Sequence, residues 1–413
     1  MVKRATLSRR SSAEWGARLL LAAVTAWVGY QAVVFSIAGG LPNSQIKRAY
    51  AMAPHNGRIA ARLSEVLSGA DATPADRARA DRLAREALRD DATAVKAVAT
   101  LGNSALFRNQ PEEARRWFEY SQRLSRRDLR TQIWAIEDAV LREDIPSALH
   151  HYDIALRVHR RANDLLFPVL VAAISEPTIR IALTKTLARQ PLWTNSFIDF
   201  ASRNRQNPEV VAALFRNLLQ VGVPVSDGAT ASILDALIAG GNYDVAWAYY
   251  AVVRPGVDRA QSRDPNLSAN LEVPSSLDWV PLDRTGISAS LQRAGDRGVF
   301  DFAAVSTVGG PVLQQLQILP PGDYVIEGHS IGISQAENAR PYWTLSCRNG
   351  KELGRVNMPN SAVNAGRFGG SFTVSDGCPV QLLMLTVRSS NEISGSTGQI
   401  DRVLLHPAVD RNE

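Results

Sequence analysis

We predict a multidomain protein of the α plus β class, in which a transmembrane helix precedes an α-solenoid and a C-terminal β-sandwich. Three observations predict this class: an uncharged apolar run near the N-terminus, a 34-residue period in the middle, and short alternating runs between turn residues near the end. A length of 413 residues itself favours more than one domain. The predicted parts are a basic tail (1–18), the transmembrane helix (19–39), the solenoid (45–253), a linker (254–273), the β-sandwich (274–407) and a C-terminal tail (408–413).

The apolar run covers residues 19–38, which is about 30 Å of α-helix and matches the hydrocarbon core of a bilayer. Five basic residues and one acidic residue precede it, whereas Lys47 and Arg48 follow it. The positive-inside rule then keeps the N-terminus of a single-pass protein in the cytoplasm and exports the bulk of the chain, which for a bacterial inner membrane means into the periplasm. Two alternatives remain: a signal peptide cleaved near Ser36-Ile37-Ala38, and a buried helix of a soluble protein.

The composition argues against several classes of function. The formal net charge is +6, but much of the excess lies in residues 1–18, so it indicates membrane topology and not a nucleic-acid partner. Two cysteines and six histidines do not supply a four-cysteine zinc site, and no Gly-rich phosphate loop, zinc-protease motif or nucleophile elbow occurs. We therefore expect no catalytic residue, no metal and no cofactor.

Small residues in the middle of the chain recur in a fixed register. Ala80, Ala114 and Ala148 follow one another at a constant spacing, and offsets of four and three from each place further small or aromatic residues on the same helix face. Gly102 lies on a preceding helix, where glycine costs about 1 kcal/mol unless another helix approaches closely. The residues expected to pack within the repeats are Ala80, Ala84, Ala87, Gly102, Ala114, Phe118, Ser121, Ala148, Tyr152, Ala155, Ala246 and Tyr250.

This pattern resembles the tetratricopeptide repeat, a helix-turn-helix unit with the same period. The resemblance covers about residues 61–162, although Arg126 and Arg160 stand where the repeat has proline, and it fades beyond residue 162. Because single units cannot bury their apolar faces, we expect one solenoid of about five to six hairpins. The family binds peptides or proteins on its concave face. The resemblance therefore makes Asn103, Phe107, Arg130, Ile133 and Glu137 candidates for contact with a protein partner, with packing between hairpins as the alternative for Phe107 and Ile133.

The C-terminal part has the pattern of a β-sandwich of short strands. A Pro-Pro-Gly-Asp turn at residues 320–323 separates two extended runs, and Asn349-Gly350 marks a hairpin. The runs of residues 314–316, 321–324 and 398–405 resemble, in order and type, segments of the jelly-roll carbohydrate-binding modules. The resemblance covers about residues 275–407 and implies a jelly roll, but many jelly rolls bind no sugar.

Aromatic rings would carry sugar binding in such a domain. Trp343 alternates in phase with Leu345 and Cys347, so it is expected in the core, whereas Tyr342 and Arg340 share the outward face. Trp279 is expected to cover one end of the sandwich. The candidates for glycan contact are Tyr342, Arg340, Trp279 and Trp343.

Both cysteines, Cys347 and Cys378, fall in the β-domain. If this domain lies outside the cytoplasm, a disulfide is their expected state, and chain entropy predicts about 3–4 kcal/mol of stabilisation from it. Two free buried thiols are the alternative.

Together these resemblances imply a non-enzymatic envelope adaptor, whose solenoid binds a protein and whose β-domain contacts a polysaccharide. The combination of an anchor, repeats and a sugar-module-like domain resembles the architecture of accessory factors of surface polysaccharide synthesis or export. One alternative is a structural scaffold of another envelope complex without sugar binding. The other is a polysaccharide-modifying enzyme.

Overall fold

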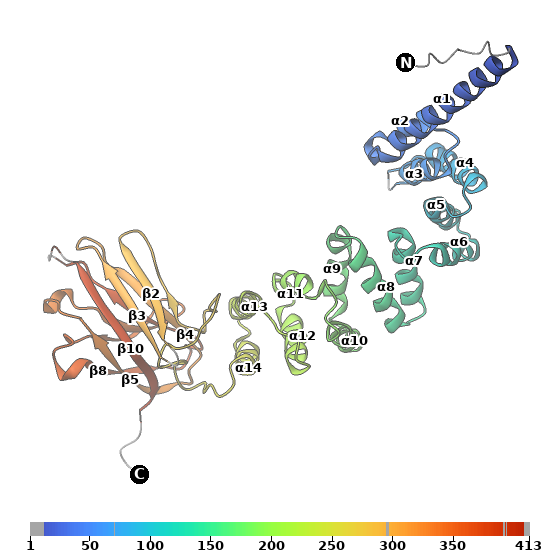
Figure 1. Cartoon of the computed structure of the whole chain (residues 1–413). Helices are drawn as coiled ribbons and strands as arrows, with labels where there is room; N and C mark the ends of the chain where they lie inside the picture. Colours follow the sequence, from blue (N-terminus) through green and yellow to red (C-terminus); the bar gives the residue numbers. More distant parts are fainter. Residues whose placement is uncertain (1–11, 70, 295–296, 391–392, 394, 409–413) are drawn as a thin grey trace, which may run out of the picture. The chain divides into compact units, whose positions relative to one another are not determined.

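The computed structural model describes residues 12–69, 71–294, 297–390, 393 and 395–408 (Figure 1). Helices α1 to α14 are followed by two antiparallel β-sheets, which confirms the predicted α plus β class. The chain divides into two compact units, Met1–Ala162 and Asn163–Glu413, so the predicted solenoid spans the division. Most of the predicted basic tail (1–11) and the end of the C-terminal tail (409–413) lie outside the described residues.

The first helix, α1 (Ser12–Gly40), contains the apolar run. Within the described part of the chain it is the helix that is long and apolar enough to cross a membrane, and none of its most apolar window is buried. A short 3-10 turn, η1 (Asn43–Gln45), and helix α2 (Ile46–Met52) connect it to the hairpins.

Three helical hairpins complete the first unit. The bounds of the second hairpin recur one sequence period later in the third, so the period read from the sequence is a period of the structure. Both hairpins also turn through the same left-handed conformation, at Asn109 (φ 59°) and Glu143 (φ 56°). The hairpins are α3 (Gly57–Leu67) with α4 (Pro74–Asp90), α5 (Val95–Phe107) with α6 (Pro111–Leu124), and α7 (Leu129–Leu141) with α8 (Ile145–Val158).

Side-chain caps start several of these helices. Thr73 and Asp76 form a capping box at α4, with Pro74 in the first helical position. The hydrogen bonds from Thr73 hold the pKa of the Asp76 carboxyl below its usual value. Asp128 and Asp144 cap α7 and α8, where each carboxylate accepts from a backbone amide of the first turn. Local polar residues therefore set the helix starts.

The residues expected to pack within the repeats are buried at every one of the twelve positions. Gly102 shows why a small residue is needed: a Cβ atom built on it would lie 2.9 Å from Cε2 of Phe118. Phe118 in turn stacks on Trp134, with ring centroids 4.9 Å apart. The Phe118 ring thus occupies the space that a side chain at position 102 would need.

Replacing Gly102 by alanine is expected to lower the free energy of unfolding of the first unit by about 1 kcal/mol. Overpacking against Phe118 costs about 1–3 kcal/mol, which exceeds the gain of about 1 kcal/mol in helix propensity. In a Phe118→Leu background the same substitution should be neutral or stabilising, because the ring is gone. Gly228 in α13 is the matched control, since its Cβ would meet its nearest neighbour at 3.9 Å. Equal destabilisation at both positions in denaturant titrations would contradict this account.

Six more helices follow, and they lie within residues 45–253, where the sequence predicts a helical solenoid. Their core contains the rings of Phe167, Trp193 and Phe197, and Phe215 packs against Tyr249. The helices are α9 (Ala162–Ala173), α10 (Pro177–Leu187), α11 (Thr194–Ser202), α12 (Pro208–Gln220), α13 (Asp227–Ala239) and α14 (Tyr243–Val253).

Two five-stranded antiparallel sheets form the β-sandwich, in the orders β1-β4-β9-β6-β7 and β2-β3-β10-β5-β8. Their inner faces enclose one apolar core around Trp343, Phe300 and Phe302. The strands are β1 (Val280–Pro281), β2 (Ile287–Ala294), β3 (Arg297–Ala304), β4 (Gly310–Gln317), β5 (Gly322–Ile331), β6 (Tyr342–Cys347), β7 (Glu352–Asn357), β8 (Arg367–Val374), β9 (Gln381–Val387) and β10 (Ser396–Pro407). The predicted disulfide between Cys347 and Cys378 is confirmed.

The segment expected to be a linker, 254–273, packs on the sandwich instead. The Ser262 amide donates to the Leu405 carbonyl (2.8 Å), and the Val403 amide donates to the Pro265 carbonyl (3.0 Å). Leu267 belongs to the sandwich core. The segment lacks a periodic pattern because it follows the surface of the sandwich without forming a strand.

Candidate binding surfaces

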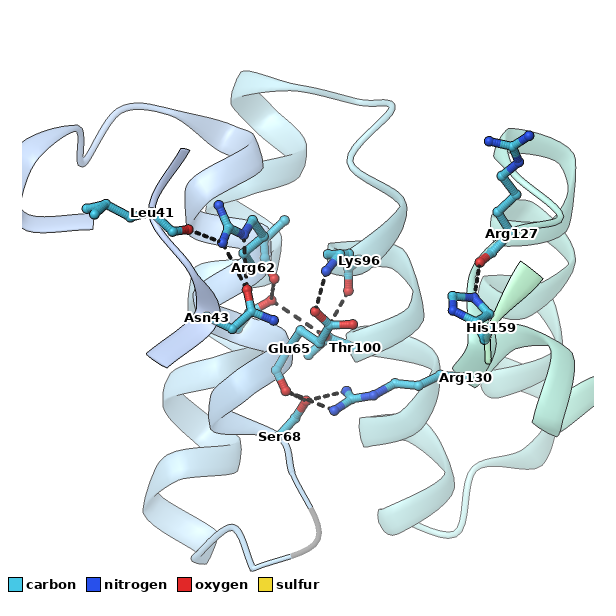
Figure 2. A network of polar contacts seen from close by, with 12 residues as sticks. Leu41, Asn43, Arg62, Glu65, Ser68, Lys96, Thr100, Arg127, Arg130 and His159 are labelled. Carbon is cyan, nitrogen blue, oxygen red and sulfur yellow. Dashed lines mark hydrogen bonds and ion pairs between the residues drawn. The ribbon is translucent and has the colours of Figure 1, made fainter. Parts of the chain in front are cut away.

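The first helices of the three N-terminal hairpins, α3, α5 and α7, are joined by a polar network (Figure 2). Lys96 donates to the Glu65 carboxylate (2.6 Å) from α5 to α3. Arg130 on α7 donates to the Ser68 hydroxyl (2.7 Å) and the Glu65 carbonyl (2.9 Å) at the last turn of α3. Because the last carbonyls of a helix lack partners within it, Arg130 caps α3. This predicted partner-binding residue therefore links two hairpins.

The structure places the other solenoid candidates at different depths. Asn103 and Ile133 are half-buried, and Glu137 is exposed. Phe107 is exposed at the end of α5, and the guanidinium of Arg77 lies 4.1 Å from its ring centroid. Phe107, which remains exposed beside Arg77, and Glu137 are therefore the solenoid candidates still accessible to a partner.

An exposed apolar set extends beyond Phe107. Leu106 and Phe107 end α5, and Val140 and Leu141 end α7 at the equivalent positions of the next repeat. All four side chains are exposed. Only Phe107 was singled out from the sequence, although applying the repeat register to it would have identified Leu141. We call these four residues the apolar helix ends.

His151 on α8, and His159 just after the end of α8, form hydrogen bonds with α7 and with the turn before it. His151 Nδ1 lies 2.8 Å from the Gln132 amide oxygen. Figure 2 shows His159, whose Nε2 lies 2.6 Å from the Arg127 carbonyl oxygen. Burial, and then the neighbouring His150, lower the pKa of His151. These contacts position the turn between α6 and α7.

Two of the predicted glycan-contacting residues lie inside the sandwich. Trp343 is 0% exposed and Trp279 is 3% exposed, with ring centroids 6.0 Å apart. The Trp279 indole donates to the Asp264 carbonyl (3.1 Å). Their burial contradicts a role as sugar platforms, because neither ring face is open to a ligand.

Tyr342 faces outward, as its alternation predicts, but its ring is in contact with cations. The guanidinium carbons of Arg355 and Arg388 lie 4.5 Å and 4.6 Å from the ring centroid. Arg355 is paired with Glu352 (2.8 Å), and Arg340 donates to the Gln335 carbonyl (3.4 Å). Cation–π contacts of this kind occupy the surface on which a sugar would stack.

A row of polar side chains on the outer face of the second sheet was missed from the sequence. His329 Nδ1 lies 2.7 Å from the Asp401 carboxylate, and Gln399 donates to the Asp301 carboxylate (2.7 Å). Asp401 lies at a β-bulge of β10, a device that redirects side chains. The strand alternation around Phe300 and Phe302 would have placed Asp301 on this face. We call His329, Asp301, Gln399 and Asp401 the polar row; their donors and acceptors can bind sugar hydroxyls.

A buried arginine joins the segment before the sandwich to β4. Arg263 is 3% exposed and donates to the Leu277 carbonyl (2.7 Å), the Leu316 carbonyl and the Gln317 side chain (2.6 Å). The side-chain amide of Gln315 donates a hydrogen bond to the backbone carbonyl of Arg263 (3.1 Å). Burial lowers the pKa of Arg263, but an arginine stays charged in proteins. We call Arg263, Gln315 and Gln317 the arginine junction.

Further contacts hold α13 and α14 against the sandwich. Tyr250 donates to the Asp278 carboxylate (2.8 Å), and burial together with that charge raises the pKa of Tyr250. Arg348, in the hairpin between β6 and β7, donates to the Ile238 carbonyl at the end of α13 (2.6 Å). The helices and the sandwich of the second unit are therefore bonded through specific polar groups.

The comparisons with known proteins concern the sandwich. No family model and no curated protein matches the chain. Among solved structures, a family 4 carbohydrate-binding module is 14% identical, with 37% of this chain and 100% of that chain covered and a TM-score of 0.24. A family 6 module of Cellvibrio mixtus lichenase 5A, solved with cellotriose, is 10% identical, with 32% and 98% covered and a TM-score of 0.21. The tailspike protein 4 of bacteriophage CBA120 is 11% identical, with 36% and 21% covered and a TM-score of 0.24, so the chain spans about a fifth of it. The part that resembles the modules is the C-terminal β-sandwich.

Proposed function

We propose that this chain is a non-enzymatic adaptor of a bacterial envelope, held by α1 in the inner membrane with its N-terminus in the cytoplasm. Its helical hairpins, interpreted as tetratricopeptide-like repeats, bind a protein partner in the periplasm. Its β-sandwich contacts a polysaccharide during synthesis or export. The observation that carries the proposal is the exposed apolar surface of α1, whose last turn is built into the first hairpin.

The packing of this last turn supports an anchor over a cleaved signal peptide. Ala38 is 0% exposed and lies in one core with Ile46, Ile59 and Leu63. Arg62 donates to the Gly39 carbonyl (3.1 Å) and the Leu41 carbonyl (2.6 Å), where a cation suits the end of a helix (Figure 2). Cleavage after Ala38 would cut within this packed turn.

The topology is tested with a full chain that carries an N-terminal epitope and a C-terminal reporter active only outside the cytoplasm. We expect reporter activity together with the epitope in the membrane fraction after an alkaline wash. A chain without residues 1–40 is the control for background release. A silent reporter, or an active reporter with the epitope lost, would overturn the anchored topology.

The polar row supports a glycan ligand, and the exposed apolar helix ends support a protein partner. The buried tryptophans and the cation-covered Tyr342 favour a second candidate, a scaffold of another envelope complex that binds no sugar. The glycan assay should use the full chain in a non-glycosidic detergent, because a fragment starting at residue 274 would lack Arg263 and Leu267 from the core.

Binding to a panel of envelope polysaccharides is expected for the wild type, with at least a tenfold loss for Asp401→Asn. Asp323→Asn is the matched control, since Asp323 accepts from Thr373 on the same sheet (2.7 Å) and lies outside the polar row. Failure of the wild type across the panel would favour the scaffold, and turnover of a polymer would favour a polysaccharide-modifying enzyme.

A further inference from the structure

We infer that the elbow between α1 and the first hairpin binds a membrane phospholipid whose headgroup carries both a phosphate and an amine. The inference rests on the proposed anchoring of α1. The elbow contains a cavity of about 640 Å³. Its apolar wall consists of α1 residues and Met52, with the polar Gln31 of α1 also in the lining. Its charged wall consists of His55 in the α2–α3 turn, Arg58 at the start of α3, and Asp90 and Asp91 at the end of α4.

The apolar wall lies where the membrane span ends. Val34 and Phe35 are three to four residues before Ala38, which is about 5 Å along the helix. Phe35 and Met52 are exposed, so the cavity continues the apolar surface that α1 presents to lipid. In an anchored chain the molecules at this depth are phospholipids, with acyl chains along α1 and headgroups beside the hairpin.

The charged wall selects the headgroup. His55 and Arg58 supply donors for a phosphate, and the Arg58 side chain is 79% exposed although its Nε is bonded to Asp91 (3.1 Å). Asp90 and Asp91 line the same cavity. Hydrogen bonds from Thr93 and Arg58 hold the pKa of Asp91 below its usual value, so its carboxylate stays ionised at neutral pH.

Carboxylates beside the hydrocarbon layer are costly without a cationic partner. Arg58 already pairs with Asp91 (3.1 Å), so a purely anionic headgroup would compete with Asp91 for Arg58 and leave the exposed Asp90 facing like charge. A headgroup with a phosphate and an ammonium group satisfies both signs, as phosphatidylethanolamine does. The charge pattern therefore favours a zwitterionic lipid.

The backbone brings these charges together by a close approach at Gly57. A Cβ atom at this position would lie 2.7 Å from the Ala87 carbonyl oxygen, so glycine lets α3 begin against the last turns of α4. Asn56 caps α3 by accepting from the Arg58 and Ile59 amides (3.0 and 3.2 Å). Arg58 is thereby held beside Asp91 at the rim of the cavity.

The test is native mass spectrometry of the full chain in a delipidating detergent, with phosphatidylethanolamine or phosphatidylglycerol added. We expect one phosphatidylethanolamine to be retained at least fivefold more strongly than phosphatidylglycerol. Arg58→Ala and, separately, Asp90→Asn should each reduce this retention at least fivefold. Arg142→Ala in the third hairpin is the control, and circular dichroism verifies that each variant is folded.

Equal retention of the two lipids, or retention unchanged in both cavity variants, would overturn the inference. Equal binding of soluble glycerophosphoethanolamine would also overturn it, because the acyl chain would then contribute nothing. The alkaline wash described above separates this failure from that of the anchor: a chain that stays in the membrane without lipid selectivity refutes only the lipid site.

Discussion

Arg263→Met is expected to lower the free energy of unfolding of the second unit by about 3–5 kcal/mol, the range for removing one partner of a buried ionic group. Methionine matches the length of the arginine stem but donates no hydrogen bond. The Leu277 and Leu316 carbonyls and the Gln317 side chain would lose their donor in the interior. Asp278, itself buried, would lose a nearby positive charge. Denaturant titration followed by tryptophan fluorescence measures the effect.

Arg402→Met provides the comparison, because Arg402 lies on the outer face of the same sandwich and its ion pair with Glu327 is exposed. Exposed pairs contribute about 0–1 kcal/mol, so this variant should unfold close to the wild type. Arg263→Lys should recover only part of the loss, since an ammonium group cannot reproduce the planar fork of bonds. Similar transitions for Arg263→Met and Arg402→Met would refute a supporting role for the arginine junction.

Removing the disulfide with Cys347→Ser and Cys378→Ser together is expected to cost about 3–4 kcal/mol, because closing such a loop restricts the unfolded chain. The bond joins residues separated by 31 positions. Within the fold, Cys347 ends β6, and Cys378 lies just before β9, the strand that pairs with β6. Thermal unfolding of the oxidised, reduced and double-serine proteins measures the cost.

Reduced wild type and the double-serine variant should melt together, below the oxidised protein. Without reductant, neither thiol of the unfolded wild type should react with an alkylating agent. Alkylation of both under those conditions would show that the bond does not form in the native protein.

The elements that follow one period could be predicted closely. The helices α5 to α8 repeat small buried residues in a fixed register, and their bounds agree with that register. Trp343 could be assigned to the core because it alternates with Leu345 on a strand. In such cases the residues of a helix or strand themselves indicate which of its faces is buried.

The first three strands, β1 to β3, were not predicted from the sequence, and for β2 and β3 a local reason can be given. The inward side of β2 includes Ala289, and β3 ends in two alanines, a residue type with low strand propensity, although the alternation of Phe300 and Phe302 within β3 is itself a strand signal. Pairing with each other and with β10 makes these segments strands. Tertiary context outweighs propensity there.

The arginine junction and the polar row depend on residues far apart in the chain. Arg263 meets Gln315 and Gln317 across 52 and 54 positions, and His329 meets Asp401 across 72. A single sequence carries no signal for such pairs, and the aperiodic segment around Arg263 has the composition of a linker. Burial of Trp279 likewise depends on its distant neighbour Trp343.

The last turn of α1 has a mechanical consequence. A flexible tether would absorb tension and let the attached unit reorient freely. Here Ala38 shares a core with Ile59 and Leu63, and Arg62 bonds the carbonyls beyond it. Under the proposed anchoring, tilting of α1 in the bilayer would be transmitted to α3, and a force on the first hairpin would load the membrane.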